Sequence, residues 1–330
     1  MKLHIFKSFS FVRLVTAFFC LILTATIAVA QTIPGQTPPA TQPTKGSVLV
    51  FNYYASSTTI ADSTGQLVVH DTTMNITNTS SAGTAFVHTF FIDGATGSNA
   101  DIYYCIPSGI TESIRASDYD PDNKGYLIAA TTDSNGTPIN FNNLTGQASL
   151  SLDSGTTATY PALAIEALTS VPALSNGFNA TLNFDGVNYS KLPRAVGMNP
   201  ALKPVGMNQN IVVINNLGRN LNSPTVPLGT LNWLLTNNTN SRNSTASTFG
   251  GTQLQAIVSE SLVPGLFTLL KGKQTGNLRV WTTTDLGVSG IFIRFRDVGG
   301  VKTLDGAGNL TTVTVTDSAK LTIPVFQIGC

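Results

Sequence analysis

Short apolar stretches of strand length, separated by turn residues, recur along most of this 330-residue chain. Near the C-terminus, Ile291, Ile293 and Phe295 occupy every second position, and Arg294 and Arg296 follow the last two of them. This period of two is typical of a strand with one buried and one solvated face. Asp-Gly and Asn-Gly pairs, which favour tight turns, separate many of the stretches. The predicted strands lie at 47–54, 84–92, 101–106, 126–131, 210–215, 231–235, 277–283, 291–295, 310–315 and 321–326.

Many short strands with such turns favour a sandwich or a barrel over alternating strand–helix units. Two stretches, 125–133 and 276–285, share the order of a glycine, a strand, threonines and an aspartate. Duplication of one domain explains this likeness, and so does convergence of two β domains on common turn residues. We predict an all-β chain of two tandem immunoglobulin-like antiparallel β-sandwiches. The first covers 46–190, a connecting segment covers 191–209, and the second covers 210–330.

The N-terminus has the layout of a secretory signal peptide. Three basic residues precede an apolar stretch at 14–27, and the small residues Ala28 and Ala30 mark a cleavage site. We therefore predict a signal peptide at 1–30 and a secreted or cell-surface protein, with an uncleaved N-terminal anchor as the alternative. Residues 31–45, rich in proline and threonine, read as a linker. The later apolar stretches are too short for helices that cross a membrane, so we expect no transmembrane segment in the mature chain.

Charge is sparse, which excludes some classes of partner. Only 11% of the residues are charged, 42% are hydrophobic, and the formal net charge is +1. A disordered chain needs low hydrophobicity and high net charge. A nucleic-acid-binding protein needs a surplus of basic residues to displace counterions. We therefore expect a folded protein that does not bind nucleic acid.

Five segments after the predicted signal peptide carry a resemblance to known proteins. They are DYDP (118–121), GYLIA (125–129), DSNGTPINF (133–141), FDGVNYSKLPR (184–194) and TIPVF (322–326), and the chain ends in a cysteine. These segments resemble a family of uncharacterised secreted bacterial proteins. The resemblance covers most of the chain after the predicted signal peptide and implies no activity. Within the first half, Asn75–Asn78 followed by Phe90–Asp93 is similar to two strands of bacterial immunoglobulin-like modules.

Three aspartates form the strongest candidate for a metal site. Asp118, Asp120 and Asp122 alternate before a glycine, as ligands 1, 3 and 5 of a calcium loop do. However, Asn123 stands where such a loop has glycine, and Ala129 stands where it has a bidentate glutamate. A structural calcium ion is one reading. The other is an exposed turn whose side chains bond their own backbone.

Cys105 and Cys330 are the two cysteines that remain after removal of the predicted signal peptide. An oxidising compartment favours a disulfide between them. The alternative is a buried Cys105 with a free or intermolecular Cys330.

Candidates for catalysis are few. His88 shares a predicted strand face with Phe86 and Phe90, so we expect a core or cross-strand hydrogen-bonded histidine rather than a metal ligand. His70 reads as a surface residue at a strand end. No Gly-x-Ser-x-Gly turn or paired-acid pattern is present in the sequence, although Glu166 and Glu260 have apolar neighbours. We predict that the chain is not an enzyme and needs no cofactor beyond the possible calcium ion.

Aromatic residues provide a possible platform for sugars. The candidates are Tyr53, Tyr54, Tyr103, Tyr104, Trp233 and Trp281. Together these features predict a non-catalytic secreted or cell-surface binding protein of the adhesion or matrix type, whose partner is an unidentified protein or glycan. One alternative is a carbohydrate-active enzyme or its sugar-binding accessory module. The other is an outer-membrane β-barrel.

Overall fold

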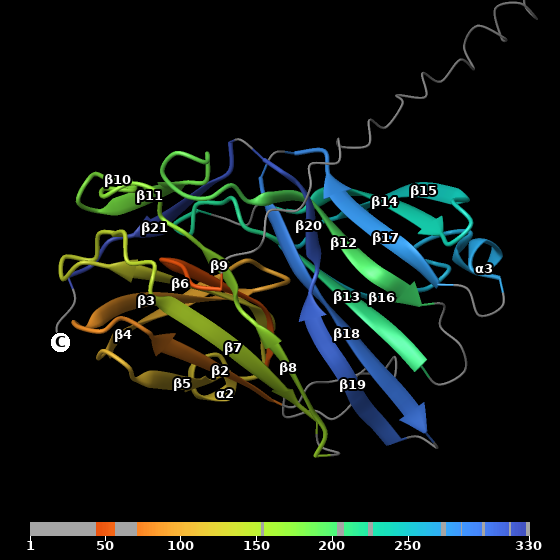
Figure 1. Ribbon diagram of the computed structural model, residues 1–330, viewed down its shortest axis with the longest axis horizontal. Coiled ribbons are helices and arrows are strands. Elements are labelled where there is room, and N and C mark those ends of the chain that lie inside the picture. The colour runs from red at the N-terminus through yellow and green to blue at the C-terminus, as the bar shows by residue number, and fades with distance from the viewer. Residues whose placement is uncertain are drawn as a thin grey trace, which may run out of the picture. The chain divides into compact units, whose positions relative to one another are not determined.

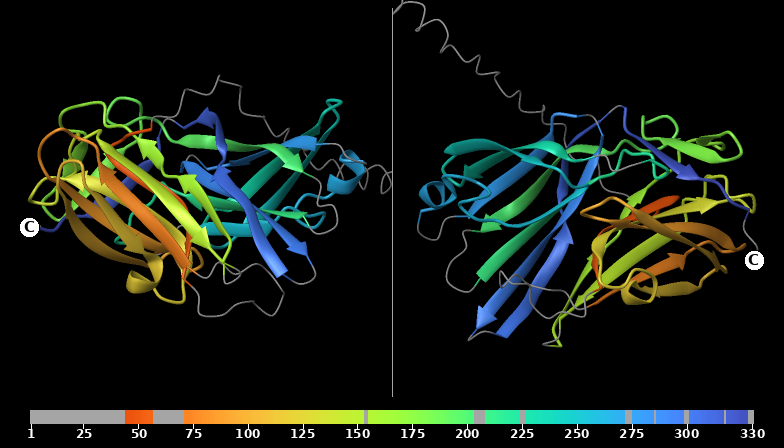
Figure 2. Two further views of the ribbon diagram at one scale, coloured as in Figure 1. Left: turned by 60° about the horizontal axis from the view of Figure 1, so that its bottom comes forward. Right: turned by 180° about the vertical axis from the view of Figure 1, so that it is seen from behind.

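Antiparallel strands dominate the computed structural model, as the sequence predicts (Figures 1 and 2). The structure describes residues 44–56, 71–152, 155–202, 208–223, 227–271, 275–284, 286–298, 301–316 and 318–327. The predicted signal peptide, residues 31–43 of the predicted linker, His70 and Cys330 lie outside the described residues. The strands form five sheets, each named below after one of its central strands.

Three sheets contain mainly strands of the first half. The β3 sheet has the order β4 (Asn99–Ile106), β3 (Ala85–Asp93), β6 (Lys124–Thr132), β1 (Val48–Ala55) and β9 (Leu163–Ile165). The β2 sheet has the order β5 (Thr111–Arg115), β2 (Asp71–Asn78), β7 (Leu144–Ser151) and β8 (Thr157–Pro161). The β11 sheet has the order β10 (Ala173–Ser175), β11 (Asn179–Asn183) and β21 (Lys320–Pro324).

The other two sheets come from the second half. The β14 sheet has the order β15 (Arg242–Phe249), β14 (Gly229–Asn237), β17 (Thr275–Thr282), β12 (Pro193–Leu202) and β20 (Thr311–Val315). The β13 sheet has the order β16 (Gln253–Ile257), β13 (Asn208–Asn216), β18 (Val288–Val298) and β19 (Val301–Asn309). Two single-turn helices, α2 (Ala116–Tyr119) and α3 (Leu266–Leu269), complete the described elements.

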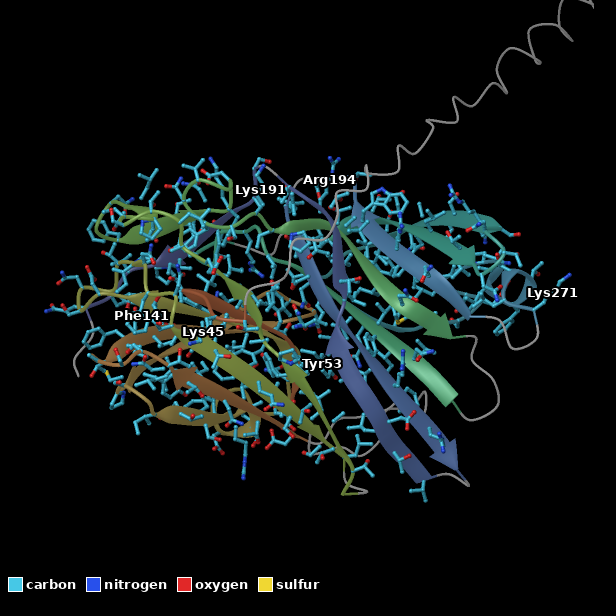
Figure 3. All side chains as sticks on the ribbon, in the orientation of Figure 1. Lys45, Tyr53, Phe141, Lys191, Arg194 and Lys271 are labelled. Carbon is cyan, nitrogen blue, oxygen red and sulfur yellow. The ribbon has the colours of Figure 1, made fainter. Side chains whose placement is uncertain are left out.

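The apolar residues of alternate strand positions gather between facing sheets. Phe51 of the β3 sheet and Ile76 of the β2 sheet belong to one buried cluster, which also contains Tyr53, labelled in Figure 3. A second cluster lies between the β13 and β14 sheets and includes Ile214 and Trp233. A third joins the opposite face of the β3 sheet to the β11 sheet.

The β13 sheet is buried on both faces, because its central strands are apolar at consecutive positions. Val212 and Ile214 pack in the cluster shared with the β14 sheet, whereas Ile211 and Val213 pack in the cluster of the first half. The predicted buried face of β18 also contributes Ile291, Ile293 and Phe295 to the first-half cluster. A continuous apolar core therefore joins residues from the two halves, and β19 lies beside β8 (Figure 1).

The all-β prediction is confirmed, but the structure does not establish two tandem immunoglobulin-like sandwiches. The last strand, β21, pairs with β11 of the first half, with Thr322 opposite Thr181. Moreover, residues 193–202, which we placed in a connecting segment, form β12 inside the β14 sheet. The prolines and glycine of this stretch suggested a linker, but Val196 and Met198 are buried on one strand face.

Candidate functional site

Uncharged polar side chains cover most of the outer face of the β2 sheet. Successive residues of a strand point to opposite faces, so Met74 and Ile76 enter the core while Thr73, Asn75 and Thr77 face outward. The neighbouring strands continue these rows. Thr77 lies between Thr111 and Thr145, Asn75 lies between Ser113 and Gln147, and Thr73 lies between Arg115 and Ser149.

A shallow depression of about 440 Å³ lies on this face. The Thr77 and Thr111 hydroxyl oxygens are 2.7 Å apart, so one donates a hydrogen bond to the other. Hydroxyl and amide groups can both donate and accept hydrogen bonds, which suits a neutral ligand rich in hydroxyl groups. The residues that line the depression are Asn75, Thr77, Thr111, Thr145, Gly146 and Gln147.

One charged pair of this sheet, between Asp71 and Arg115, is not among the residues that line the depression. At the start of β2, Asp71 Oδ2 is 3.6 Å from Arg115 Nε. Asp71 also accepts a hydrogen bond from the Ser117 hydroxyl at 2.8 Å. The carboxylate is thus engaged locally, and the depression itself is lined by neutral groups.

From the sequence, Asn75–Asn78 was noted for its likeness to an immunoglobulin-like strand, but no residue of this face was predicted as part of a binding surface. The signal is present in TTMNITN (72–78) and TGQASLS (145–151), where uncharged polar residues recur at every second position. Such alternation is common to all exposed strands, so only the pairing of β2, β5 and β7 identifies the surface on which these residues converge.

The predicted calcium ligands do not assemble into a metal site in the described residues. There, no group of three or more histidine, cysteine, aspartate or glutamate side chains is placed to hold a metal ion. The Asp120 carboxylate instead accepts hydrogen bonds from the Tyr54 hydroxyl and from Asn123 Nδ2. Burial and the adjacent Asp120 carboxylate raise the pKa of Tyr54. Asp120 therefore satisfies a buried hydroxyl.

The predicted aromatic platform is largely absent from the described surface. Tyr53, Tyr54 and Trp233 are at most 1% exposed, and Trp281 is 5% exposed. Tyr104 is also buried, and Tyr103 is half-buried against His88. The rings were predicted as candidates because aromatic faces stack on sugars, but hydrophobic burial takes most of them into the core.

His88 is a core histidine with a cross-strand hydrogen bond, as predicted. Its Nε2 lies 2.8 Å from Asp101 Oδ2, and its ring stacks on Tyr103 with centroids 3.8 Å apart. The side chain is fully buried, and its Nδ1 atom has no hydrogen-bond partner. Burial lowers the pKa of His88 to about 4, and the hydrogen bond to Asp101 opposes that shift. The ring is therefore neutral at physiological pH.

Glu260 also has a structural role. Its Oε1 accepts the backbone N–H of Gly265 at 2.5 Å, and its Oε2 accepts that of Phe267 at 2.8 Å. These donors lie at the start of α3, where backbone N–H groups lack partners within the helix. Glu166 is half-buried beside β9.

Cys105 forms a disulfide bond. Because Cys330 lies outside the described residues, its pairing with Cys105 stays a prediction. Within the part of the chain that the structure describes, none of the helices has the length and apolar character needed to cross a lipid bilayer.

No protein-family model matches the sequence, and no curated protein is significantly similar to it. The resemblance to a family of secreted bacterial proteins therefore stays a prediction, and the functional argument depends on the surface of the chain itself.

Proposed function

We propose that this chain is a non-catalytic secreted or cell-surface protein of the adhesion or matrix type, which binds a neutral glycan on the outer face of the β2 sheet. The observation that carries this proposal is the neutral depression lined by Asn75, Thr77, Thr111, Thr145 and Gln147. Its volume of about 440 Å³ is within the usual range of ligand sites.

Surface chemistry favours a glycan over an anionic or a strongly apolar partner. A sugar chain presents many hydroxyl groups, each able to donate and accept, and the rows of threonine, serine, asparagine and glutamine offer the same capacity. Anionic ligands are instead held by arginine and lysine through charge-assisted bonds. The described lining holds none of these cations.

The environments of the acid and base candidates support binding rather than catalysis. A general base needs an accessible atom within hydrogen-bond reach of its substrate. His88 is fully buried, with Nε2 engaged by Asp101. The two carboxylate oxygens of Glu260 accept backbone N–H groups near α3.

We further propose that the facing β3 and β2 sheets are an immunoglobulin-like sandwich and that the β13 and β14 sheets are a second one. The buried clusters between these pairs of sheets support this architecture. Export through a signal peptide at residues 1–30 is part of the same proposal. N-terminal sequencing of the protein recovered from the culture medium or cell surface tests it, with Gln31 as the expected first residue.

Affinity electrophoresis through gels that contain polysaccharides tests the binding function. We expect neutral polysaccharides to retard the protein, polyanionic ones to retard it little, and the sugar chains to keep their length. Release of new reducing ends would instead support the carbohydrate-active enzyme. Unretarded migration through every neutral polysaccharide would contradict the proposed ligand class.

A further inference from the structure

The strand β15 forms an open edge of the β14 sheet. Its register with β14 runs without a shift from Arg242 opposite Thr236 to Phe249 opposite Gly229. The strand lies at the margin of the sheet, and its other side has no strand partner among the described residues (Figure 1). An edge of this kind presents a row of unpaired backbone N–H and C=O groups, which can pair with another chain.

The hairpin that joins β14 to β15 fixes which backbone groups point outward. The Asn237 N–H donates to the Ser241 carbonyl oxygen at 3.0 Å. Because directly bonded pairs alternate along an antiparallel ladder, every second residue from position 243 onward bonds to β14. The residues between them turn their N–H and C=O groups toward the free edge, and no backbone group of the described residues bonds to them there. These outward residues are Arg242, Ser244, Ala246 and Thr248.

The other edges of the five described sheets carry features that hinder pairing, whereas β15 does not. Natural proteins protect sheet edges with short strands, charges, irregular pairing or a covering segment. β9 and β10 have three residues each, β4 and β5 contain charged residues, and β20 pairs irregularly with β12. β8 and β19 pack against each other, and loop residues bond to β16 and β21. By contrast, β15 has eight residues, a regular register and a single charge at its end.

We propose that β15 pairs with β15 of a second copy of this chain, so that two β14 sheets join into one antiparallel sheet. In a two-fold register centred on Thr245, Ser244 faces Ala246 of the second copy, and Arg242 faces Thr248 of the second copy. The outward residues of both copies then exchange backbone hydrogen bonds. Such a contact is closed, because both copies use the same surface.

Charge and side-chain size favour this occupant. The two Arg242 side chains lie at opposite ends of the antiparallel contact, whereas a parallel, in-register pairing would place these like charges side by side. The other exposed side chains of β15 are small: Ser244, Ala246 and Thr248. At the axis, Thr245 of one copy faces Thr245 of the other, and cross-strand threonine pairs are favourable.

The expected dimer is weak and reversible. One pair of edge strands is a small interface, and contacts that bury less than about 1,200 Å² are commonly transient. The edge belongs to the β14 sheet, whereas the neutral depression lies on the β2 sheet. The dimer therefore does not depend on the proposed glycan binding.

Sedimentation velocity over a range of protein concentrations tests the pairing. We expect a reversible shift from monomer to dimer as the concentration rises. Ala246→Lys should raise the midpoint concentration about tenfold or more, because the two lysines lie diagonally across the axis, within reach of each other. Ala246→Ser is the matched control and should associate as the wild type does. Wild-type protein that stays monomeric up to about 1 mM would overturn the proposal.

A mixture of two charged variants tests whether β15 is the contact surface. Ala246→Lys and Ala246→Glu should associate more readily when mixed than either does alone, since unlike charges then meet across the axis. A dimer formed through another surface would show no such preference, and that result would also contradict the proposal.

Hydrogen exchange of the wild type keeps the test decisive if the charged variants do not fold, with circular dichroism as the check. The amide protons of Ser244 and Ala246 point toward the free edge. They should exchange about tenfold more slowly when about nine tenths of the protein is dimeric. Equal exchange rates in monomeric and dimeric protein are incompatible with pairing through β15.

Discussion

Asn215 on β13 donates a hydrogen bond from Nδ2 to the backbone carbonyl oxygen of Asn52 on β1, at 2.8 Å, across 163 positions of the chain. Both residues are at most 1% exposed. Asn52 Nδ2 in turn donates to Asn309 Oδ1 at 2.9 Å, and Gln253 Nε2 donates to Asn215 Oδ1 at 2.8 Å. These bonds connect β1 of the β3 sheet to the β13 sheet, beside the apolar core that the two sheets share.

Removal of the Asn215 amide should destabilise the protein. Asn215→Ala leaves the buried Asn52 carbonyl and Gln253 amide short of a partner, which costs about 1–3 kcal/mol. Urea denaturation measures the loss. The control is Asn135→Ala in an exposed turn, which should change the free energy of unfolding by about 0.5 kcal/mol or less. Equal losses in the two variants would contradict the role of the buried network.

Stability should fall as the pH decreases below the ordinary pKa of histidine. Burial lowers the folded-state pKa of His88 to about 4, so the unfolded chain takes up a proton at higher pH than the folded chain does. The contribution of neutral His88 to the free energy of unfolding is therefore complete above about pH 6.5. It is lost as the pH falls toward 4, at up to about 1.4 kcal/mol per pH unit.

Urea denaturation between pH 7.5 and pH 4 measures this dependence, with His88→Gln as the comparison. Carboxylates also titrate in this range, but the wild type and His88→Gln have the same carboxylates, so their effect is common to both proteins. We expect the difference between wild type and variant to shrink as the pH falls. A difference that stays constant with pH is incompatible with a neutral, buried His88.

The stability of the protein should depend on the carboxylate of Asp120 more than on the other carboxylates of residues 118–122. Asp120→Ala removes the acceptor of the buried Tyr54 hydroxyl, at a cost of about 1–3 kcal/mol. Asp118→Ala, at an exposed position of the same turn, is the matched control. Thermal unfolding with and without added calcium distinguishes a calcium-binding loop from a turn that is held by its own hydrogen bonds. If both variants lost a calcium-dependent stabilisation equally, the turn would be a calcium loop after all.

Much of the fold follows from local patterns, whereas the sheet partners do not. The alternation at Ile291, Ile293 and Phe295 predicted the buried face of β18, yet that face packs against the core of the first half. Likewise, Thr322 of the predicted last strand pairs with Thr181, far earlier in the chain. Period two reports that a face is buried, but it carries no information about which sheet covers it.

The site shows the same division between local and non-local information. His88 was predicted as a core residue from its apolar neighbours, but its partner Asp101 became evident only through the pairing of β3 with β4. Thr77, Thr111 and Thr145 are unremarkable threonines in the sequence. They become a surface because β5, β2 and β7 are neighbours in one sheet.

The central claim is that the neutral face of the β2 sheet binds a glycan. Two cross-strand threonine pairs provide a matched comparison. Thr77 and Thr111 border the depression with hydroxyls 2.7 Å apart, whereas Thr230 and Thr248 form a similar pair at 3.2 Å on the β14 sheet. Replacement of either pair by valine keeps the side-chain shape and removes two hydroxyl groups.

Titration calorimetry of the two double variants, with the neutral polysaccharide that most retards the wild type, tests the claim most directly. Loss of two ligand hydrogen bonds, at about 0.5–1.5 kcal/mol each, should weaken binding by Thr77→Val/Thr111→Val about fivefold or more. Thr230→Val/Thr248→Val should bind as the wild type does. Equal affinity of the two variants, both folded, would contradict the account.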